Sequence, residues 1–483
     1  MDTWSRLSIP QLQQLMQRGE LTSVALVEHF IARIERWDGG SNGLNAVRLV
    51  NSQALQQAAA LDEERRLTGP RSALHGVPVL VKDNYATVGM PTTAGSILLA
   101  NHQPSYDAAA VARLKAAGAV ILGKTNMHEF AYGITTVGSA FGQTRNPYDP
   151  TRNPGGSSGG TGAAIGADFA VFGMGSDTCG SIRIPAAHNN LVGLRGTQGL
   201  SSRFGIVPLS HTQDIGGPLA RSVEDLAIAL DATVGVDVKD EQTRAAAGQH
   251  PASYFEALQT LNGLRVGVLS DWLVVDEEDQ PVADVLLQAL NVMQDKAGWQ
   301  IKSITSAELN QSLARDFDGH YVLIADFAQD INAYLAEHTD IAPRNLKALL
   351  DSGQVHPQVV PSLRASLSLQ DAQPQAYQTE LSQRKVVAAA MMQLLEQHQL
   401  DVLAYPTIRQ VAVKLGEVQP GTNCRLAANS GLPAMSIPAG FAGRMPVGLE
   451  LLAPAWQEQL LLNAALTMQT HHPQRRSPEL SAR

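Results

Sequence analysis

Two short apolar segments constrain the fold more than any other feature of this chain. Residues 77–81 read VPVLV, and Lys82 follows them at once. Residues 119–122 read AVIL and come directly after a helical pattern that stops at Gly118. A short continuous apolar run suits a strand that is covered on both faces. Because helix and strand alternate here, we predict an α/β fold.

The flanking segments add helices and one irregular stretch. Ser8 with the following proline predicts a helix start, and apolar residues at helical spacing predict a second helix from Thr22 onward. Residues 141–217 are rich in glycine, serine and proline, so we expect a loop-rich, functional stretch there. Residues 236–400 read as mostly helical, and strand character returns from residue 401.

Composition excludes several classes of function. The 483 residues carry a net charge of −9 and no block of Lys or Arg, so the footprint of a nucleic-acid or anionic-membrane binder is missing. The sequence contains no run of about 18 apolar residues, so it predicts no membrane span. Two cysteines, Cys179 and Cys424, are too few for a disulfide framework in a chain of this length. We therefore expect a cytoplasmic protein in a reducing setting.

The sequence NPGGSSGGTG, residues 153–162, allows several interpretations. A P-loop requires a lysine after its glycines, and a dinucleotide fingerprint requires a strand before them; the sequence indicates neither. Ser157 lies in a Gly-x-Ser-x-Gly pattern like the nucleophile elbow of α/β-hydrolases. That elbow requires a buried strand before it, and the sequence indicates none there. A glycine-rich surface turn stays open at this point.

Lysine and serine together offer a catalytic interpretation. Lys82 ends a buried strand, where low dielectric lowers the pKa of its amine. A neutral lysine can act as a general base. Ser181, in GSDTCGSIRIPA, lies downstream of the glycine-rich run. A lysine, a bridging serine and a nucleophilic serine would form a proton relay without histidine. Lys124, which also follows an apolar strand, is the rival base.

Four segments resemble the amidase signature family of serine hydrolases: VPVLVKDN, NPGGSSGGTGAAIGA, GSDTCGSIRIPAA and GLRGTQG. The similarity extends to GPLARSVEDLA and NSGLPAMSIPAGF. It implies a large twisted mixed β-sheet covered by α-helices on both faces. It also implies one amidase domain over residues 1–483, with a signature core at 65–235. Residues 236–400 would form a variable, mostly helical region that selects substrate, and residues 401–460 the returning strands.

The resemblance implies a Ser–Ser–Lys triad. The lysine of the family matches Lys82, the bridging serine after a cis peptide bond matches Ser157, and the acylated nucleophile matches Ser181. Ser181 would attack the amide carbonyl while the proton passes through Ser157 to Lys82. As an alternative, Cys179 would be the nucleophile, a thiol beside a lysine.

Supporting roles follow from the same resemblance. It implies an oxyanion hole made by four consecutive backbone N–H groups: Thr178, Cys179, Gly180 and Ser181. Ser158 either anchors the lysine or is a plain turn residue. Asp177 would hold the nucleophile loop through backbone amides, and Arg183 would brace it. Cys179 stands where many relatives have glycine, so a positive φ there would strain the loop. His128 and His188 are expected to be structural.

We therefore expect an amidase that hydrolyses a carboxamide or N-acyl amide of a small molecule or peptide, without a cofactor or metal ion. The alternative is the amidase component of a tRNA-dependent glutamine amidotransferase, which works with a partner protein. A non-catalytic binding protein is disfavoured because all three triad positions are filled. A homodimer is one option for the assembly. Tyr321, Phe327 and Tyr334 either line an acyl pocket or pack on the core.

Overall fold

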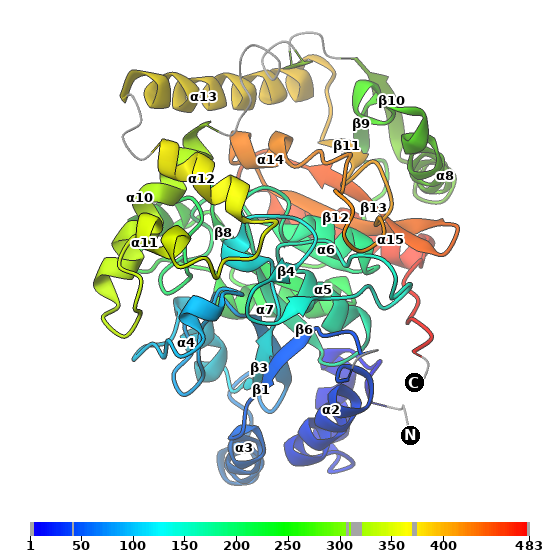
Figure 1. The fold of residues 1–483 in the computed structure, drawn as a ribbon. Coiled ribbons are helices and arrows are strands. Elements are labelled where there is room, and N and C mark those ends of the chain that lie inside the picture. Colours follow the sequence, from blue (N-terminus) through cyan, green and yellow to red (C-terminus); the bar gives the residue numbers. More distant parts are fainter. Residues whose placement is uncertain (1–3, 41–42, 306–308, 311–320, 370–373, 481–483) are drawn as a thin grey trace.

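The computed structural model describes residues 4–40, 43–305, 309–310, 321–369 and 374–480. Figure 1 shows a central sheet surrounded by helices, with α2 and α3 at the bottom of the view and α13 across the top. No helix among the described residues is both long enough and apolar enough to cross a membrane.

One mixed sheet of 11 strands forms the centre of the protein, in the order β1-β3-β2-β6-β8-β7-β12-β13-β11-β9-β10. Its strands are β1 (Val47–Val50), β2 (Pro78–Lys82), β3 (Val120–Thr125), β6 (Phe172–Asp177), β7 (Val192–Arg195), β8 (Ile215–Ala220), β9 (Arg265–Leu269), β10 (Gln300–Ile304), β11 (Val402–Pro406), β12 (Ala434–Ala442) and β13 (Met445–Leu452). β2 lies parallel to both β3 and β6, whereas β6 lies antiparallel to β8. A separate ladder joins β4 (Val137–Gly138) to β5 (Gly142–Gln143).

Helices pack against both faces of this sheet, which confirms the predicted fold class (Figure 1). The α-helices are α1 (Ile9–Gln17), α2 (Ser23–Trp37), α3 (Ala54–Thr68), α4 (Ala109–Ala116), α5 (Gly159–Gly166), α6 (Arg183–His188), α7 (Val223–Thr233), α8 (Gln280–Ala297), α10 (Tyr321–Glu337), α11 (Leu346–Asp351), α12 (Val360–Ser368), α13 (Pro374–Gln397), α14 (Arg425–Ser430) and α15 (Glu458–His471). Short 3₁₀ helices lie at Ile97–Leu99, Glu129–Ala131, Glu241–Ala246, Ser270–Trp272 and Glu277–Asp279.

Local sequence signals explain the elements that lead to the site. All five residues of β2 are buried between β3 and β6, as the continuous apolar run predicts. Gly118, with φ +88°, ends the turn between α4 and β3. Ser222 accepts the N–H of Asp225 and caps α7.

Regular elements interrupt the loop-rich stretch expected at residues 141–217, although most of its residues lie outside them. That stretch contains α5, β6, α6 and β7, and β8 begins within it. Its glycines serve packing: a Cβ on Gly173 would lie 2.5 Å from Thr161 Cγ2, and one on Gly175 would lie 2.8 Å from Leu219 Cδ1. Glycine at 173 therefore lets α5 pack closely on β6, and glycine at 175 leaves room for the side chain of Leu219 on the neighbouring strand β8. The mostly helical segment 236–400 also contributes two strands, β9 and β10.

Two of the three aromatic residues suggested for an acyl pocket lie in a hydrophobic cluster. Phe327 on α10 is fully buried, with its ring centroid 5.1 Å from that of Tyr132. Tyr334 donates or accepts a hydrogen bond with His102 Nε2 at 2.8 Å. The core interpretation therefore applies to Phe327 and Tyr334. Tyr321, at the first residue of α10, is only partly buried.

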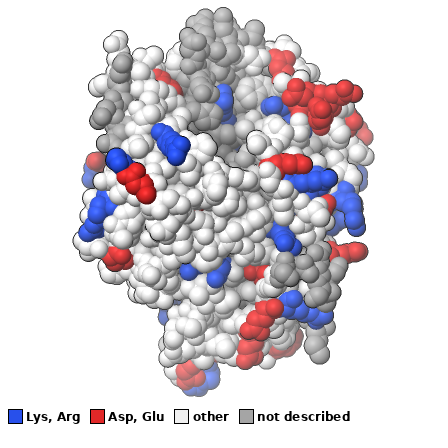
Figure 2. Space-filling view, in the orientation of Figure 1, with Lys and Arg blue, Asp and Glu red and all other residues white. Residues whose placement is uncertain are grey.

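On the face seen in Figure 2, Lys and Arg side chains of the described residues lie scattered among uncharged ones. This distribution agrees with the lack of a Lys or Arg block in the sequence.

Candidate active site

Lys82 lies at the end of β2 with its side chain fully buried. Its Nζ is 2.7 Å from Ser157 Oγ and 2.8 Å from Ser176 Oγ. Ser176 belongs to β6, and its hydroxyl also accepts a hydrogen bond from Asn84 Nδ2 at 2.9 Å. The parallel pairing of β2 and β6 therefore brings the lysine to Ser176, and Ser157 approaches it from the segment before α5.

Burial changes the acid–base chemistry of this lysine. It lowers the pKa of Lys82 from 10.5 to about 7, although the carboxylates of Asp214 and Asp177 act in the opposite direction. A lysine with this pKa is substantially neutral near pH 7, so its lone pair can accept a proton. It has the properties of a general base.

The glycine-rich run places Ser157 beside this amine. The peptide bond between Gly156 and Ser157 is cis. The carbonyl of Ser157 accepts the N–H of His128 at 3.0 Å, and the N–H of Ser158 donates to the carbonyl of Ser181 at 3.2 Å. The backbone thus joins the two serine segments. Among the described residues Ser181 Oγ makes no hydrogen bond, so a hydroxyl contact between Ser157 and Ser181 stays a prediction.

The nucleophile loop, residues 178–181, connects β6 to the turn that begins α6. Asp177 accepts the N–H of Gly180 at 2.7 Å and the N–H of Ile182 at 3.1 Å. Thr178 donates its hydroxyl to Asp214 at 2.5 Å. Gly180 has a φ of +87°, the left-handed conformation that favours glycine. Cys179 is not among the residues with positive φ, so the strain considered for it does not arise.

A buried ionic network lies behind the nucleophile loop. Arg183 Nε is 3.1 Å from Asp177 Oδ2, and its Nη1 donates to Glu450. Arg195 Nη1 lies 3.1 Å from Asp177 Oδ1. Although burial opposes its charged form, Arg183 and Arg195 hold the pKa of the Asp177 carboxyl well below its usual range. A buried carboxylate shared by two guanidinium groups fixes the start of the loop.

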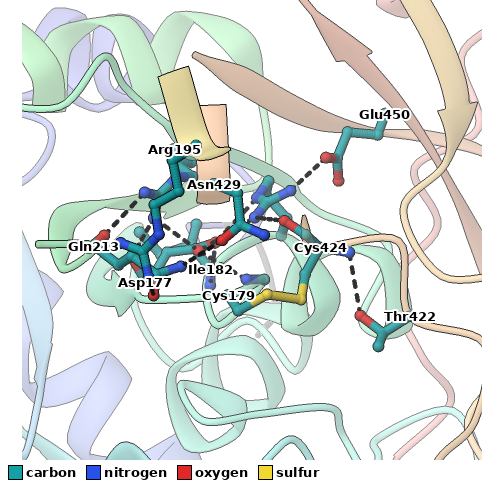
Figure 3. Close-up of a disulfide and its surroundings, with 12 residues drawn as sticks. Asp177, Cys179, Ile182, Arg195, Gln213, Thr422, Cys424, Asn429 and Glu450 are labelled. Atoms are coloured by element: carbon teal, nitrogen blue, oxygen red, sulfur yellow. Dashed lines mark hydrogen bonds and ion pairs between the residues drawn. A yellow bond between two sulfur atoms is a disulfide. The ribbon is translucent and has the colours of Figure 1, made fainter. Parts of the chain in front are cut away.

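The two cysteines form a disulfide between Cys179 and Cys424, 245 residues apart in the chain (Figure 3). The prediction of a reducing setting was based on a cysteine count too small for a framework, but one bridge needs only two cysteines. The low cysteine count therefore does not indicate a reducing compartment. The pairing also removes the alternative nucleophile, because Cys179 has no free thiol in this structure.

Ser158 and Lys124 lie close to the site but contact other groups than the sequence predicts. Ser158 Oγ lies 3.2 Å from the carbonyl of Ser176, so it braces β6 and does not bond to Lys82. Lys124 Nζ donates to the carbonyl of Tyr85 at 2.8 Å and lies 3.1 Å from Asp83 Oδ1. Burial lowers the pKa of Lys124 to about 8, with Asp83 opposing the shift. None of these contacts is with a serine, unlike those of Lys82.

Sequence reasoning missed two side chains at Lys82. The hydroxyl of Ser176 accepts a hydrogen bond from the amine and another from Asn84 Nδ2 on its other side. A signal for Asn84 was present, because it follows the lysine by two residues. The signal for Ser176 was hidden by the glycines of β6.

The two histidines near the site are buried and their pKa values are depressed. Burial lowers the pKa of His128 to about 3 and that of His188 to about 4. His128 Nδ1 accepts the N–H of Thr136 at 3.1 Å. Both rings are therefore neutral near pH 7. No group of three or more His, Cys, Asp or Glu side chains suited to a metal ion occurs in the described part of the chain.

Comparison with known proteins places this chain in a family. A family model described as Amidase matches residues 25–462. The chain belongs to the amidase signature family. This amidase is 38% identical over 482 residues to a glutamyl-tRNA(Gln) amidotransferase subunit from Thermus thermophilus, covering 95% of this chain and 96% of the relative.

Two solved structures resemble the amidase along their whole length. Native peptide amidase from Stenotrophomonas maltophilia gives a TM-score of 0.90 with 33% identity, covering 100% of both chains. The corresponding glutamyl-tRNA(Gln) amidotransferase subunit from Thermotoga maritima gives a TM-score of 0.78 with 25% identity, covering 99% of this chain and 98% of that one. The chain is therefore a hydrolase of carbon–nitrogen amide bonds, as its sequence predicts.

Proposed function

We propose that this chain is a stand-alone amidase that hydrolyses a carboxamide or N-acyl amide through an acyl-enzyme on Ser181. Lys82 and Ser157 form the proton relay. The observation that carries the proposal is the position of Lys82: its amine is buried, lies 2.7 Å from Ser157 Oγ, and has a pKa of about 7. A dry, neutral lysine in contact with a serine is what this relay requires.

The reaction follows from these groups. Ser181 Oγ attacks the carbonyl carbon of the amide; its proton goes to Ser157, and the proton of Ser157 goes to Lys82 Nζ. When the carbon–nitrogen bond breaks, the proton returns by the same route to the leaving nitrogen. Water then attacks the ester on Ser181 and gives up a proton to the relay. The acyl C–O bond breaks, the relay returns that proton to Ser181 Oγ, and the carboxylic acid leaves.

The oxyanion of the tetrahedral intermediate requires hydrogen-bond donors that are free to receive it. The N–H of Gly180 is already donated to Asp177, which takes it out of the set of four that the resemblance implies. The N–H groups of Cys179 and Ser181 make no hydrogen bond within the described residues. We assign the oxyanion to these two, with Thr178 beside them.

Overall structure favours the stand-alone enzyme over the amidotransferase component. The peptide amidase superposes with a TM-score of 0.90, and the amidotransferase protein from Thermotoga maritima with 0.78. By this comparison, a peptide that ends in an amide is the substrate class to test first. The 38% identity to the Thermus thermophilus protein supports a second candidate function, which is glutamine hydrolysis within a complex.

Assays of the purified chain on its own discriminate between the two. We expect it to release ammonia from peptide amides, or amine from aryl amides, without a partner protein, and a fluorophosphonate probe to add to Ser181. Ser181→Ala should abolish both signals. Turnover of glutamine alone, and only when a partner protein is supplied, would replace the proposal with the second candidate. Full activity of Ser181→Ala would reject both.

A further inference from the structure

One half of the disulfide belongs to the loop that carries Ser181. Cys179 is the second residue of the nucleophile loop, two positions before Ser181. Cys424 is the N-cap residue of α14 and is only 6% exposed. The bridge therefore ties the loop that carries the nucleophile to a helix 245 residues further along the chain (Figure 3).

Residue 424 also lies against both the loop and the first residue of α6. Arg183 Nη2 donates to the carbonyl of Cys424 at 3.4 Å. A Cβ on Gly180 would lie 3.0 Å from Cys424 Cβ and 2.7 Å from Ile184 Cδ1. Gly180 is thus enclosed between α6 and Cys424. The start of α14 forms one wall of the nucleophile loop.

The other anchors of the loop do not hold Cys179. Asp177 holds Gly180 and Ile182, and Asp214 holds Thr178. The backbone N–H and carbonyl of Cys179 make no hydrogen bond in the described part of the chain. At Cys179 the disulfide is therefore the bond that fixes the loop.

We propose that the Cys179–Cys424 disulfide is a positioning element for catalysis, which keeps the N–H groups of Cys179 and Ser181 directed at the oxyanion. This inference rests on the proposed function. Loss of one oxyanion donor typically costs on the order of 10²–10³ in kcat, and a small misplacement of a reacting group also slows the reaction. Opening the bridge should therefore slow acylation of Ser181 while the fold persists.

We expect the protein to stay folded without the disulfide. Asp177, Arg183 and Glu450 are fully buried and hold one another through bonds that do not involve sulfur. Cys179 is partly exposed. With dithiothreitol, the protein S–S bond breaks and gains two electrons and two protons to give two thiols, while the reagent is oxidised to its cyclic disulfide.

The test compares oxidised wild type, wild type treated with dithiothreitol, and Cys424→Ala. We expect kcat to fall at least on the order of tenfold on reduction, with KM changed much less. The pH midpoint of kcat/KM near 7 should not move, because the bridge does not touch Lys82. Cys424→Ala should show the low kcat from the start and no response to dithiothreitol.

A matched control separates positioning from stability. Val27→Ala removes two buried methyl groups from α2, a helix that carries none of the site residues, and should lower the melting temperature while leaving kcat unchanged. Circular dichroism of reduced wild type keeps the test independent of whether Cys424→Ala folds.

The proposal is overturned if reduced wild type keeps its kcat, if reduction unfolds the protein, or if alkylation finds two free thiols before reduction. Failure of the proposed function has a different signature. Oxidised wild type would then not react with a fluorophosphonate at Ser181.

Discussion

Replacing Lys82 with methionine should abolish turnover and at the same time stabilise the fold. In the unfolded chain this lysine is protonated below its ordinary pKa of 10.5, whereas in the folded protein its pKa is about 7. At pH 7 this shift therefore lowers the free energy of unfolding by about 4 kcal/mol relative to a chain without the lysine. Methionine leaves the hydroxyls of Ser157 and Ser176 without this partner, at a cost of about 2 kcal/mol. At pH 7 the Lys82→Met variant should therefore be more stable than wild type by about 2 kcal/mol.

The lowered pKa of Lys82 also determines how the stability of the wild type changes with pH. Between pH 8 and 9.5 the unfolded wild type holds one proton on Lys82 that the folded protein does not, so wild-type stability rises with pH. Relative to Lys82→Met, this rise is about 1.4 kcal/mol per pH unit, or about 2 kcal/mol over the interval. By pH 9.5 the advantage of the variant should therefore have disappeared.

Urea denaturation at pH 7, 8 and 9.5, followed by circular dichroism, measures this difference directly. Lys347→Met, at an exposed lysine, is the control and should show no such trend. If the difference between wild type and Lys82→Met does not change with pH, or if the variant retains turnover, Lys82 is not a neutral base and the reasoning is wrong.

Three further predictions concern the same site. The value of kcat/KM should rise about tenfold per pH unit below pH 7 and level off above it, because only the neutral form of Lys82 accepts a proton; a profile that is flat from pH 5 to 8 would rule this out. Ser176→Ala, which removes a hydroxyl 2.8 Å from that amine, should lower kcat/KM about tenfold and shift the midpoint of the pH profile; an unchanged rate and midpoint would show that the contact is incidental. Gly180→Ala places a Cβ 2.7 Å from Ile184 Cδ1 at a φ of +87°. Its kcat should fall on the order of 100-fold, and steady-state kinetics with wild-type kcat would show that the loop tolerates displacement.

Local pattern was enough to find the strand that carries the base. The apolar run before Lys82 predicts both its burial and its lowered pKa, and both are present. β6 gave no such signal, because Gly173 and Gly175 interrupt it. Tertiary packing explains these glycines, because at each of them a Cβ would collide with another element. A single sequence does not show that collision, so Ser176 on the same strand was missed.

The disulfide and the ionic network were hidden for a related reason. Cys179 pairs with Cys424, and Arg183 pairs with Glu450 across 267 residues. Each contact depends on how distant segments meet around the sheet, and no local spacing encodes it. The prediction that Arg183 braces the structure came from family resemblance, whereas its carboxylate partners come from the structure.

The central claim is that the folded protein holds an uncharged primary amine beside its serines. Titration of Lys82 by NMR, with lysine labelled at Cε in the Ser181→Ala variant and the signal assigned through Lys82→Met, tests this without any substrate. We predict a transition centred near pH 7. A transition close to 10.5, the ordinary lysine value, would mean that the amine is charged at neutral pH, and the proton relay could not operate.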